Sequence, residues 1–180
     1  MNVLASLDYH HRSPNPLQYG VRKVAASHPG AWLLSRVLRH LDGFVLRATG
    51  ERTSLTAMAA GLPVVMLSTT GARTGRRRTI PLMGIPYEGT IAVAGANFGQ
   101  PDTPGWVHNL AALPDAEVRY RGRALKVTAR PATEAESVEL ADAATVVYPP
   151  SAGYARRAAE RGMRVFILEG TRYPSPSQGP

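Results

Sequence analysis

The stretch Ser68–Leu82, STTGARTGRRRTIPL, follows the apolar run Leu62–Leu67 and leads into a second apolar run, Ile80–Tyr87. A glycine-bounded turn between two such runs predicts a β-hairpin. The turn combines hydroxyl groups, glycines whose backbone N–H groups can face a ligand, and four permanently charged guanidinium groups. These donors come from Thr69, Thr70, Gly71, Arg73, Thr74, Gly75, Arg76, Arg77 and Arg78. The hairpin is therefore either a site for phosphate or carboxylate, or a solvated basic turn.

The composition is that of a strongly basic, cysteine-free protein. The chain has 180 residues, 44% of them hydrophobic, which suffices for one domain with its own core. The formal net charge of +8 indicates a polyanionic partner: nucleic acid, an anionic membrane surface, or a cofactor with phosphate or carboxylate groups. The lack of cysteine excludes disulfides, thiolate metal sites and cysteine nucleophiles. We expect no metal site, because no third ligand lies at metal-binding spacing from His10-His11.

The first third of the chain divides into a polar extension and a helical region. Residues 1–28 are polar and include two prolines, so we expect them to be loosely ordered. Residues 29–61 are expected to be helical, because apolar residues recur at helical spacing from Leu34 onward. The first of these helices either packs on the barrel or rests its basic side on an anionic membrane. The absence of a signal core or a convincing membrane span favours a cytoplasmic protein, with membrane association as the alternative.

The middle of the chain predicts a strand over 90–97 followed by a helix over 104–113. The strand ends in small residues, Ala94-Gly95-Ala96-Asn97, which allow a flat ring to lie against the backbone. In the helix, Trp106 and Asn109 lie three residues apart, on the side expected to face the core.

The remaining elements complete a barrel. Strands at 116–120 and 124–129 alternate in the manner of a half-buried barrel wall. Thr133 and Glu136 have the spacing of a capping box, which starts a helix that runs to about Val147. A last strand follows at 163–168. We expect one domain over 29–170, with its barrel over 62–170 and a frayed tail at 171–180.

Three motifs resemble one known family. The pattern TTGxRTGxxRxxPL over 69–82 is similar to the signature of the deazaflavin-dependent nitroreductase family. The helix motif Trp106-x-x-Asn109-Leu110 and the segment from Tyr148-Pro149 to the closing strand occur in the same order as in that family. The resemblance implies an α+β fold: a split β-barrel, FMN-binding-like, of about six mainly antiparallel strands with flanking helices. It also implies coenzyme F420 as the cofactor, with FMN ranked second.

The resemblance assigns roles residue by residue. The arginines of the turn would hold the phosphate and the oligoglutamate tail of the coenzyme, and the other cofactor residues would border or brace the deazaflavin ring. The implied cofactor-binding residues are Thr70, Arg73, Thr74, Gly75, Arg76, Arg77, Arg78, Ile80, Pro81, Leu82, Ala94, Gly95, Ala96, Asn97, Trp106 and Asn109. Tyr148 and Tyr154 are the candidate catalytic residues, and Met83 and Ser151 belong to the substrate pocket. Ala72 replaces a cation that characterised relatives carry.

The expected activity is hydride transfer from reduced F420 to an electron-poor acceptor, either a quinone, an enone or other activated alkene, or a nitroaromatic. One alternative is a split barrel that binds FMN, haem or lipid. Another is a non-enzymatic basic module on nucleic acid or anionic membrane. Nucleic acid is disfavoured because aromatic residues are sparse, with three Phe in the chain. We expect a monomer or a weak homodimer.

Overall fold

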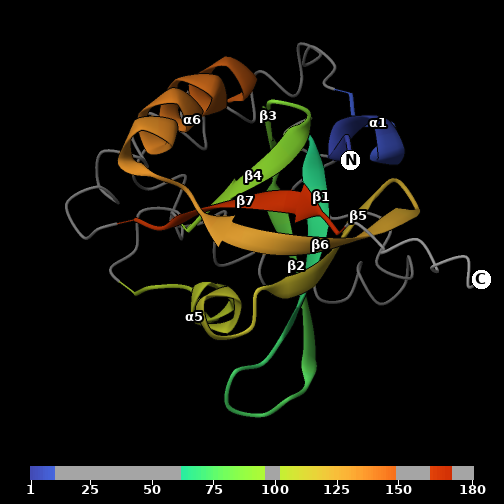
Figure 1. Ribbon diagram of the computed structural model, residues 1–180, viewed down its shortest axis with the longest axis vertical. Helices are drawn as coiled ribbons and strands as arrows, with labels where there is room; N and C mark the ends of the chain where they lie inside the picture. Colours follow the sequence, from blue (N-terminus) through green and yellow to red (C-terminus); the bar gives the residue numbers. More distant parts are fainter. Residues whose placement is uncertain (11–61, 96–101, 149–162, 172–180) are drawn as a thin grey trace, which may run out of the picture.

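The computed structural model describes residues 1–10, 62–95, 102–148 and 163–171 of the chain (Figure 1). The helices expected at 29–61 and the tail at 172–180 lie outside these residues, as do the site candidates Ala96, Asn97, Ser151 and Tyr154. The described helices are α1 (Val3–Leu7), α5 (Gly105–Ala112) and α6 (Glu134–Val147). The strands are β1 (Val64–Thr70), β2 (Arg77–Met83), β3 (Ile85–Tyr87), β4 (Thr90–Ala94), β5 (Asp115–Tyr120), β6 (Arg123–Pro131) and β7 (Val165–Gly170).

The seven described strands form one antiparallel sheet in the order β2-β1-β5-β6-β7-β4-β3. The hairpin expected around residues 68–82 is confirmed as β1 and β2, paired from Val64 with Met83 to Thr70 with Arg77. The sheet curls, so that the expected antiparallel split barrel with flanking helices is also confirmed (Figure 1).

The strand count differs from the expected six because the run Ile80–Tyr87 is broken at Gly84 into β2 and β3. These two strands are consecutive in the chain yet occupy opposite edges of the sheet. The Gly84 N–H donates to the Pro63 carbonyl, and a Cβ on Gly84 would lie 3.1 Å from Val65 and 3.2 Å from Tyr9. A glycine therefore permits the turn by which one edge of the curled sheet passes into the other.

The core lies inside the curled sheet, where side chains that alternate along the strands meet α1 and α5. Its fully buried members include Leu67, Val93, Val118, Phe166 and Leu168. A second apolar cluster lies on the outer face of β3, β4 and β7, where Leu140 and Ala144 of α6 cover the sheet. Alternation along the strands therefore places one set of side chains in the inner core and the other set under α6.

The expectation of a loosely ordered extension is wrong for its first ten residues. Residues 3–7 form α1, which Asn2 caps by accepting a hydrogen bond from the Ala5 N–H. Val3 and Leu7 are completely buried in the barrel core, and the Tyr9 hydroxyl donates to the Gly84 carbonyl at 2.7 Å. Five residues are too few for a stable isolated helix, so tertiary burial holds α1 in place, and the local sequence gives no signal of it.

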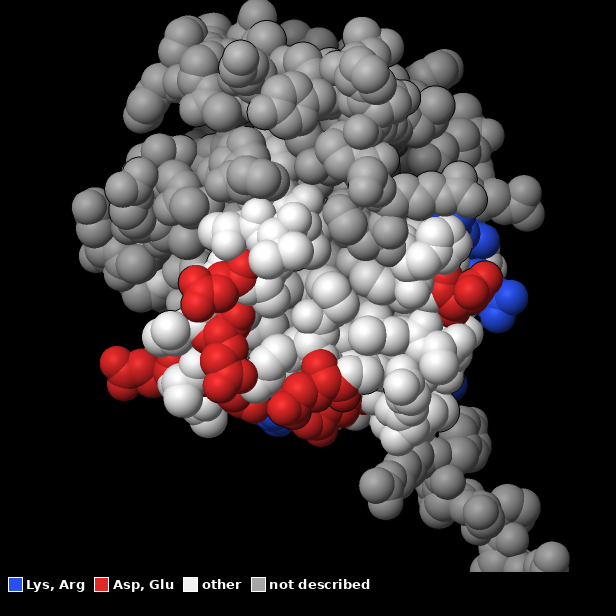
Figure 2. Space-filling view, turned by 90° about the horizontal axis from the view of Figure 1, so that it is seen from above, with Lys and Arg blue, Asp and Glu red and all other residues white. Residues whose placement is uncertain are grey.

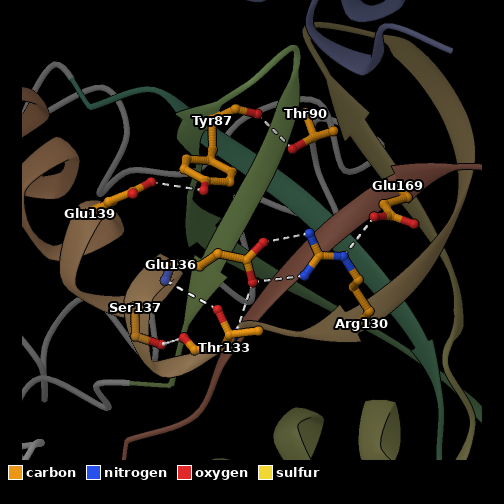
Figure 3. Close-up of polar contacts among 8 residues, drawn as sticks. All are labelled: Tyr87, Thr90, Arg130, Thr133, Glu136, Ser137, Glu139 and Glu169. Atoms are coloured by element: carbon orange, nitrogen blue, oxygen red, sulfur yellow. Dashed lines mark hydrogen bonds and ion pairs between the residues drawn. The ribbon is translucent and has the colours of Figure 1, made fainter.

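The helix α6 begins with the capping box expected from the sequence. The Thr133 hydroxyl accepts from the Glu136 N–H, and the Glu136 carboxylate accepts from the Thr133 N–H. Figure 3 shows that Arg130 of β6 lies between Glu136 and Glu169 of β7, with hydrogen bonds of 2.7–2.9 Å to both. The cap is thus joined to two strands of the sheet.

Candidate functional site

The turn between β1 and β2 is closed by its own hydrogen bonds. The Gly71 N–H donates to the Arg76 carbonyl, and the N–H groups of Thr74 and Gly75 donate to the Gly71 carbonyl at 3.1 and 2.8 Å. Gly75 has a φ of +63°, which favours glycine, and a Cβ on Gly71 would lie 2.7 Å from the Thr74 hydroxyl oxygen. The sequence suggested that these backbone N–H groups face a ligand, but in the structure they are used within the turn itself. Anion binding at this turn depends on the guanidinium groups instead.

The helix α5 holds this turn in position through one side chain. The Oδ1 atom of Asn109 accepts from the Ala72 N–H at 3.0 Å, while its Nδ2 atom donates to the buried hydroxyl of Thr69 at 3.1 Å. The sequence placed Asn109 near the site, and the structure shows the contact by which it acts. Asn109 fixes the turn relative to the barrel, so we describe it as a positioning residue.

The four arginines of the turn have different surroundings. Arg77 donates to Glu117 of β5 at 2.7 Å and to Ser68 at 2.9 Å. By contrast, Arg73, Arg76 and Arg78 are exposed, and their guanidinium groups make no hydrogen bond or ion pair with the part of the chain that the structure describes. Three cations thus remain available on a turn whose backbone is fixed. That combination fits a flexible polyanion such as the phosphate and oligoglutamate of F420.

Glu117 was not among the residues expected from the sequence. Its carboxylate accepts from Arg77 and from Arg119, at 2.7 and 3.1 Å. The hydrogen bond from Arg77 lowers the pKa of Glu117, although partial burial opposes this effect. The alternation of strand 116–120 suggests an outward Glu117, but only the pairing of β1 with β5 places it beside the turn.

The β2 residues of the candidate site divide between the two faces of the sheet. Ile80 and Leu82 pack against the inner core, whereas Met83 packs against the cluster under α6. Because side chains alternate along a strand, Pro81 faces the same side as Met83, opposite Leu82. One flat ring therefore does not lie against Pro81 and Leu82 on the same face of β2.

The small residues at the end of β4 have a packing role in the described structure. A Cβ on Gly95 would lie 2.9 Å from Val107 of α5 and 3.2 Å from the Arg164 carbonyl, to which the Gly95 N–H donates. Trp106 is buried against Phe166, with ring centroids 6.0 Å apart. Ala94 packs on the other side, in the cluster under α6. Gly95 thus lets α5 approach the end of β4, and Trp106 packs α5 into the core. Both contacts position the helix that carries Asn109.

The candidate catalytic residue Tyr148 lies at the C-terminal end of α6. It is 7% exposed, and its N–H donates to the Ala144 carbonyl. Within the described residues no group of three or more His, Asp or Glu side chains could hold a metal ion. None of the described helices is long and apolar enough to span a membrane.

The curled antiparallel sheet defines a split-barrel protein, and its hairpin carries exposed arginines at one end of the barrel. The family model for F420H(2)-dependent quinone reductases matches residues 37–170. The chain belongs to this family of oxidoreductases, and coenzyme F420 is its cofactor.

Individual relatives agree with this assignment. An F420H(2)-dependent quinone reductase of Mycobacterium tuberculosis is 38% identical over 103 residues, which cover 56% of this chain and 68% of that relative. The solved structure of an F420-H2 dependent reductase is 34% identical, with a TM-score of 0.55, and covers 59% of this chain and 94% of its own. A second solved structure, described as a domain-swapped dimer, is 30% identical with a TM-score of 0.57, and covers 78% and 99%.

Proposed function

We propose that this chain reduces a quinone at the expense of reduced F420, with the anionic part of the cofactor bound by Arg73, Arg76 and Arg78. The observation that carries the proposal is a hydrogen-bonded hairpin turn with three exposed arginine side chains that have no partner among the described residues, in a family that depends on this cofactor. A quinone is the acceptor in the names of the family and of the Mycobacterium tuberculosis relative. When bound, reduced F420 supplies the hydride. The chain contributes binding, orientation and exclusion of water.

The first test is a titration with oxidised F420, followed by intrinsic fluorescence, with FMN in parallel. Trp106 is a buried residue of α5 close to Asn109, so its fluorescence should report cofactor binding. We expect F420 to bind in the micromolar range and Arg78→Ala to weaken it by about tenfold or more, because one charge-assisted hydrogen bond is lost. Preferential binding of FMN would replace the cofactor assignment, and absence of both would leave a basic module without this cofactor.

A turnover assay identifies the acceptor class. Reduced F420 is mixed with the protein and a soluble quinone, an enone or a nitroaromatic, and reoxidation of the deazaflavin is followed by absorbance. We expect the quinone to give the highest kcat/KM. A higher value with the enone or the nitroaromatic would overturn the quinone proposal while keeping F420 as the cofactor.

The two tyrosines remain candidates for polarising the acceptor or protonating the product. The position of Tyr148, buried at the end of α6, supports a fixed orientation of its ring. Tyr148→Phe and Tyr154→Phe keep the ring and remove the hydroxyl. A loss of kcat of about tenfold or more, with little change in KM, supports proton transfer in the reaction. Unchanged kcat in both variants assigns proton delivery to solvent.

We also propose a cytoplasmic protein that is monomeric or forms a weak homodimer and does not bind nucleic acid. The similarity to a domain-swapped dimer makes self-association worth measuring by light scattering across a dilution series. Contact with an anionic membrane through residues 29–61 is tested by flotation with anionic and neutral vesicles.

A further inference from the structure

Two neighbouring arginines of the turn point to opposite faces of the hairpin. In the register of β1 and β2, Arg78 lies opposite Thr69, whose hydroxyl accepts from Asn109 of α5. Arg77 lies opposite Thr70 and contacts Ser68 and Glu117 on the other face. Because side chains alternate along a strand, a tail bound along the α5 side meets Arg78 and not Arg77.

The second face of the hairpin carries its own carboxylate. Glu117 lies opposite Ser68 in the pairing of β1 with β5, and it accepts from both Arg77 and Arg119. Ser68 also contacts Thr79 at 2.9 Å, so the Arg77 guanidinium is held within a connected polar cluster. An external carboxylate or phosphate that approached Arg77 would have to displace Glu117 or lie beside its negative charge. Either outcome disfavours anion binding on this face.

We propose that Glu117 is a specificity-determining residue that occupies Arg77 and confines the anionic tail of the cofactor to the α5 side of the hairpin. The inference rests on the proposed function in that F420 is the polyanion. Glu117 pairs with Arg77, and its negative charge repels an approaching anion. One of the four arginines is thereby removed from the binding surface, and Arg73, Arg76 and Arg78 remain.

Variants of the full-length protein test the proposal. They are Arg77→Ala, Arg78→Ala, Glu117→Gln and the double variant Glu117→Gln/Arg77→Ala. Glu169→Gln is the matched control, since it removes the same charge from a carboxylate of β7 that pairs with Arg130 of β6. Each protein is titrated with oxidised F420 at low and high salt, and with a short γ-linked glutamate peptide that lacks the ring. Thermal unfolding shows whether each variant is folded.

We expect Glu117→Gln to lower the Kd of F420 by about three- to tenfold at low salt, since Arg77 becomes available to the tail. The gain should disappear in the double variant and at high salt. The effect of Arg77→Ala should be at least about threefold larger in the Glu117→Gln background than in the native protein. Glu169→Gln should leave the Kd within about twofold, which separates a local effect from a change in net charge.

An unchanged or higher Kd in Glu117→Gln overturns the proposal, as does an equal effect of Arg77→Ala in both backgrounds. Failure of F420 to bind the native protein overturns the proposed function separately. The peptide then still reports the anion site, because tighter peptide binding by Glu117→Gln supports confinement by Glu117 without the ring. If the peptide binds none of the proteins as well, the confinement proposal fails.

Discussion

Asn109 joins α5 to the hairpin through both ends of its amide group, one to the Ala72 N–H and one to the Thr69 hydroxyl. Asn109→Ala removes both bonds and leaves the hydroxyl of Thr69, a residue that is 2% exposed, without this partner. We expect a loss of about 1–3 kcal/mol in the free energy of unfolding and a Kd for F420 raised by about three- to tenfold. Urea unfolding and the fluorescence titration measure the two effects.

Asn109→Asp separates the effect of the two hydrogen bonds on the position of the turn from the effect of charge on cofactor binding. Its two oxygens can accept from the Ala72 N–H and from the Thr69 hydroxyl, so stability should be largely retained. The new negative charge beside the arginine turn should still raise the Kd for F420, by an amount that falls at high salt. If instead the two variants bind F420 as tightly as the native protein, Asn109 supports only the fold and is not a positioning residue.

At the scale of elements, α6 is joined to the sheet by charges that respond to acid. The hydrogen bond from Arg130 lowers the pKa of Glu136 from 4.5 to about 2. Because the folded-state pKa is the lower one, this stabilisation is complete above about pH 4.5 and is lost as the pH falls toward 2. The stability of the native protein should therefore decline between pH 5 and pH 2 more steeply than that of Glu136→Gln.

Urea midpoints at several pH values between 5 and 2 check this slope, with Glu134→Gln as the control. Glu134 lies in the same first turn of α6 but makes no ion pair with the described residues, so its variant should keep the native slope. Parallel slopes for the native protein and Glu136→Gln would show that the ion pair with Arg130 does not contribute to stability in water.

Elements that depend on local chemistry could be predicted from the sequence. The turn residues Gly71 and Gly75 indicate the hairpin, and Thr133 with Glu136 indicates the start of α6, because each signal lies within a few residues of its effect. The break at Gly84 could not be predicted in this way. It depends on Pro63, Val65, Tyr9 and Ile91, which come together only when the sheet curls.

In the candidate site too, local signals could be predicted from the sequence, whereas contacts between distant residues could not. The pattern of residues 69–82 indicated the arginine turn and its anionic partner, but alternation alone could not show that Arg77 is held by a carboxylate 40 residues away. Similarly, the sequence predicted a cofactor role for Gly95 and Trp106 but gave no sign of the contacts with Val107 and Phe166 by which they position α5. Pairing between distant strands decides which side chains of a motif remain available to a ligand.

At the scale of the whole molecule, opposite charges lie over different elements. The arginine turn extends from one end of the barrel, whereas α6 carries Glu134, Glu136, Glu139 and Asp142 without a Lys or Arg. Figure 2 shows acidic side chains gathered on the face seen from above, with basic ones visible only near its margin. A polyanionic cofactor is therefore drawn toward the hairpin and repelled from α6. Its association rate should fall as salt rises, which stopped-flow fluorescence measures; a salt-independent rate would exclude electrostatic steering.

The opposite end of the barrel is closed by α1, far from the arginine turn (Figure 1). Leu7 is 1% exposed there, and the Leu4 N–H donates to the Gly89 carbonyl at 3.1 Å. Leu7→Ala should lower the free energy of unfolding by about 2–5 kcal/mol, because it removes buried apolar volume and leaves a cavity. Val146→Ala, at a side chain that is 81% exposed, should change it by less than about 0.5 kcal/mol.

The same Leu7→Ala protein tests whether the two ends of the barrel are independent. Cofactor binding uses the hairpin and α5, whereas Leu7 contacts the core from the other end, so we expect the Kd for F420 to stay within about twofold at temperatures where the variant remains folded. A Kd that rises in step with the loss of stability would show instead that α1 holds the barrel in the shape that cofactor binding requires. Stability and binding are measured on one preparation, so that incomplete folding is not mistaken for weaker binding.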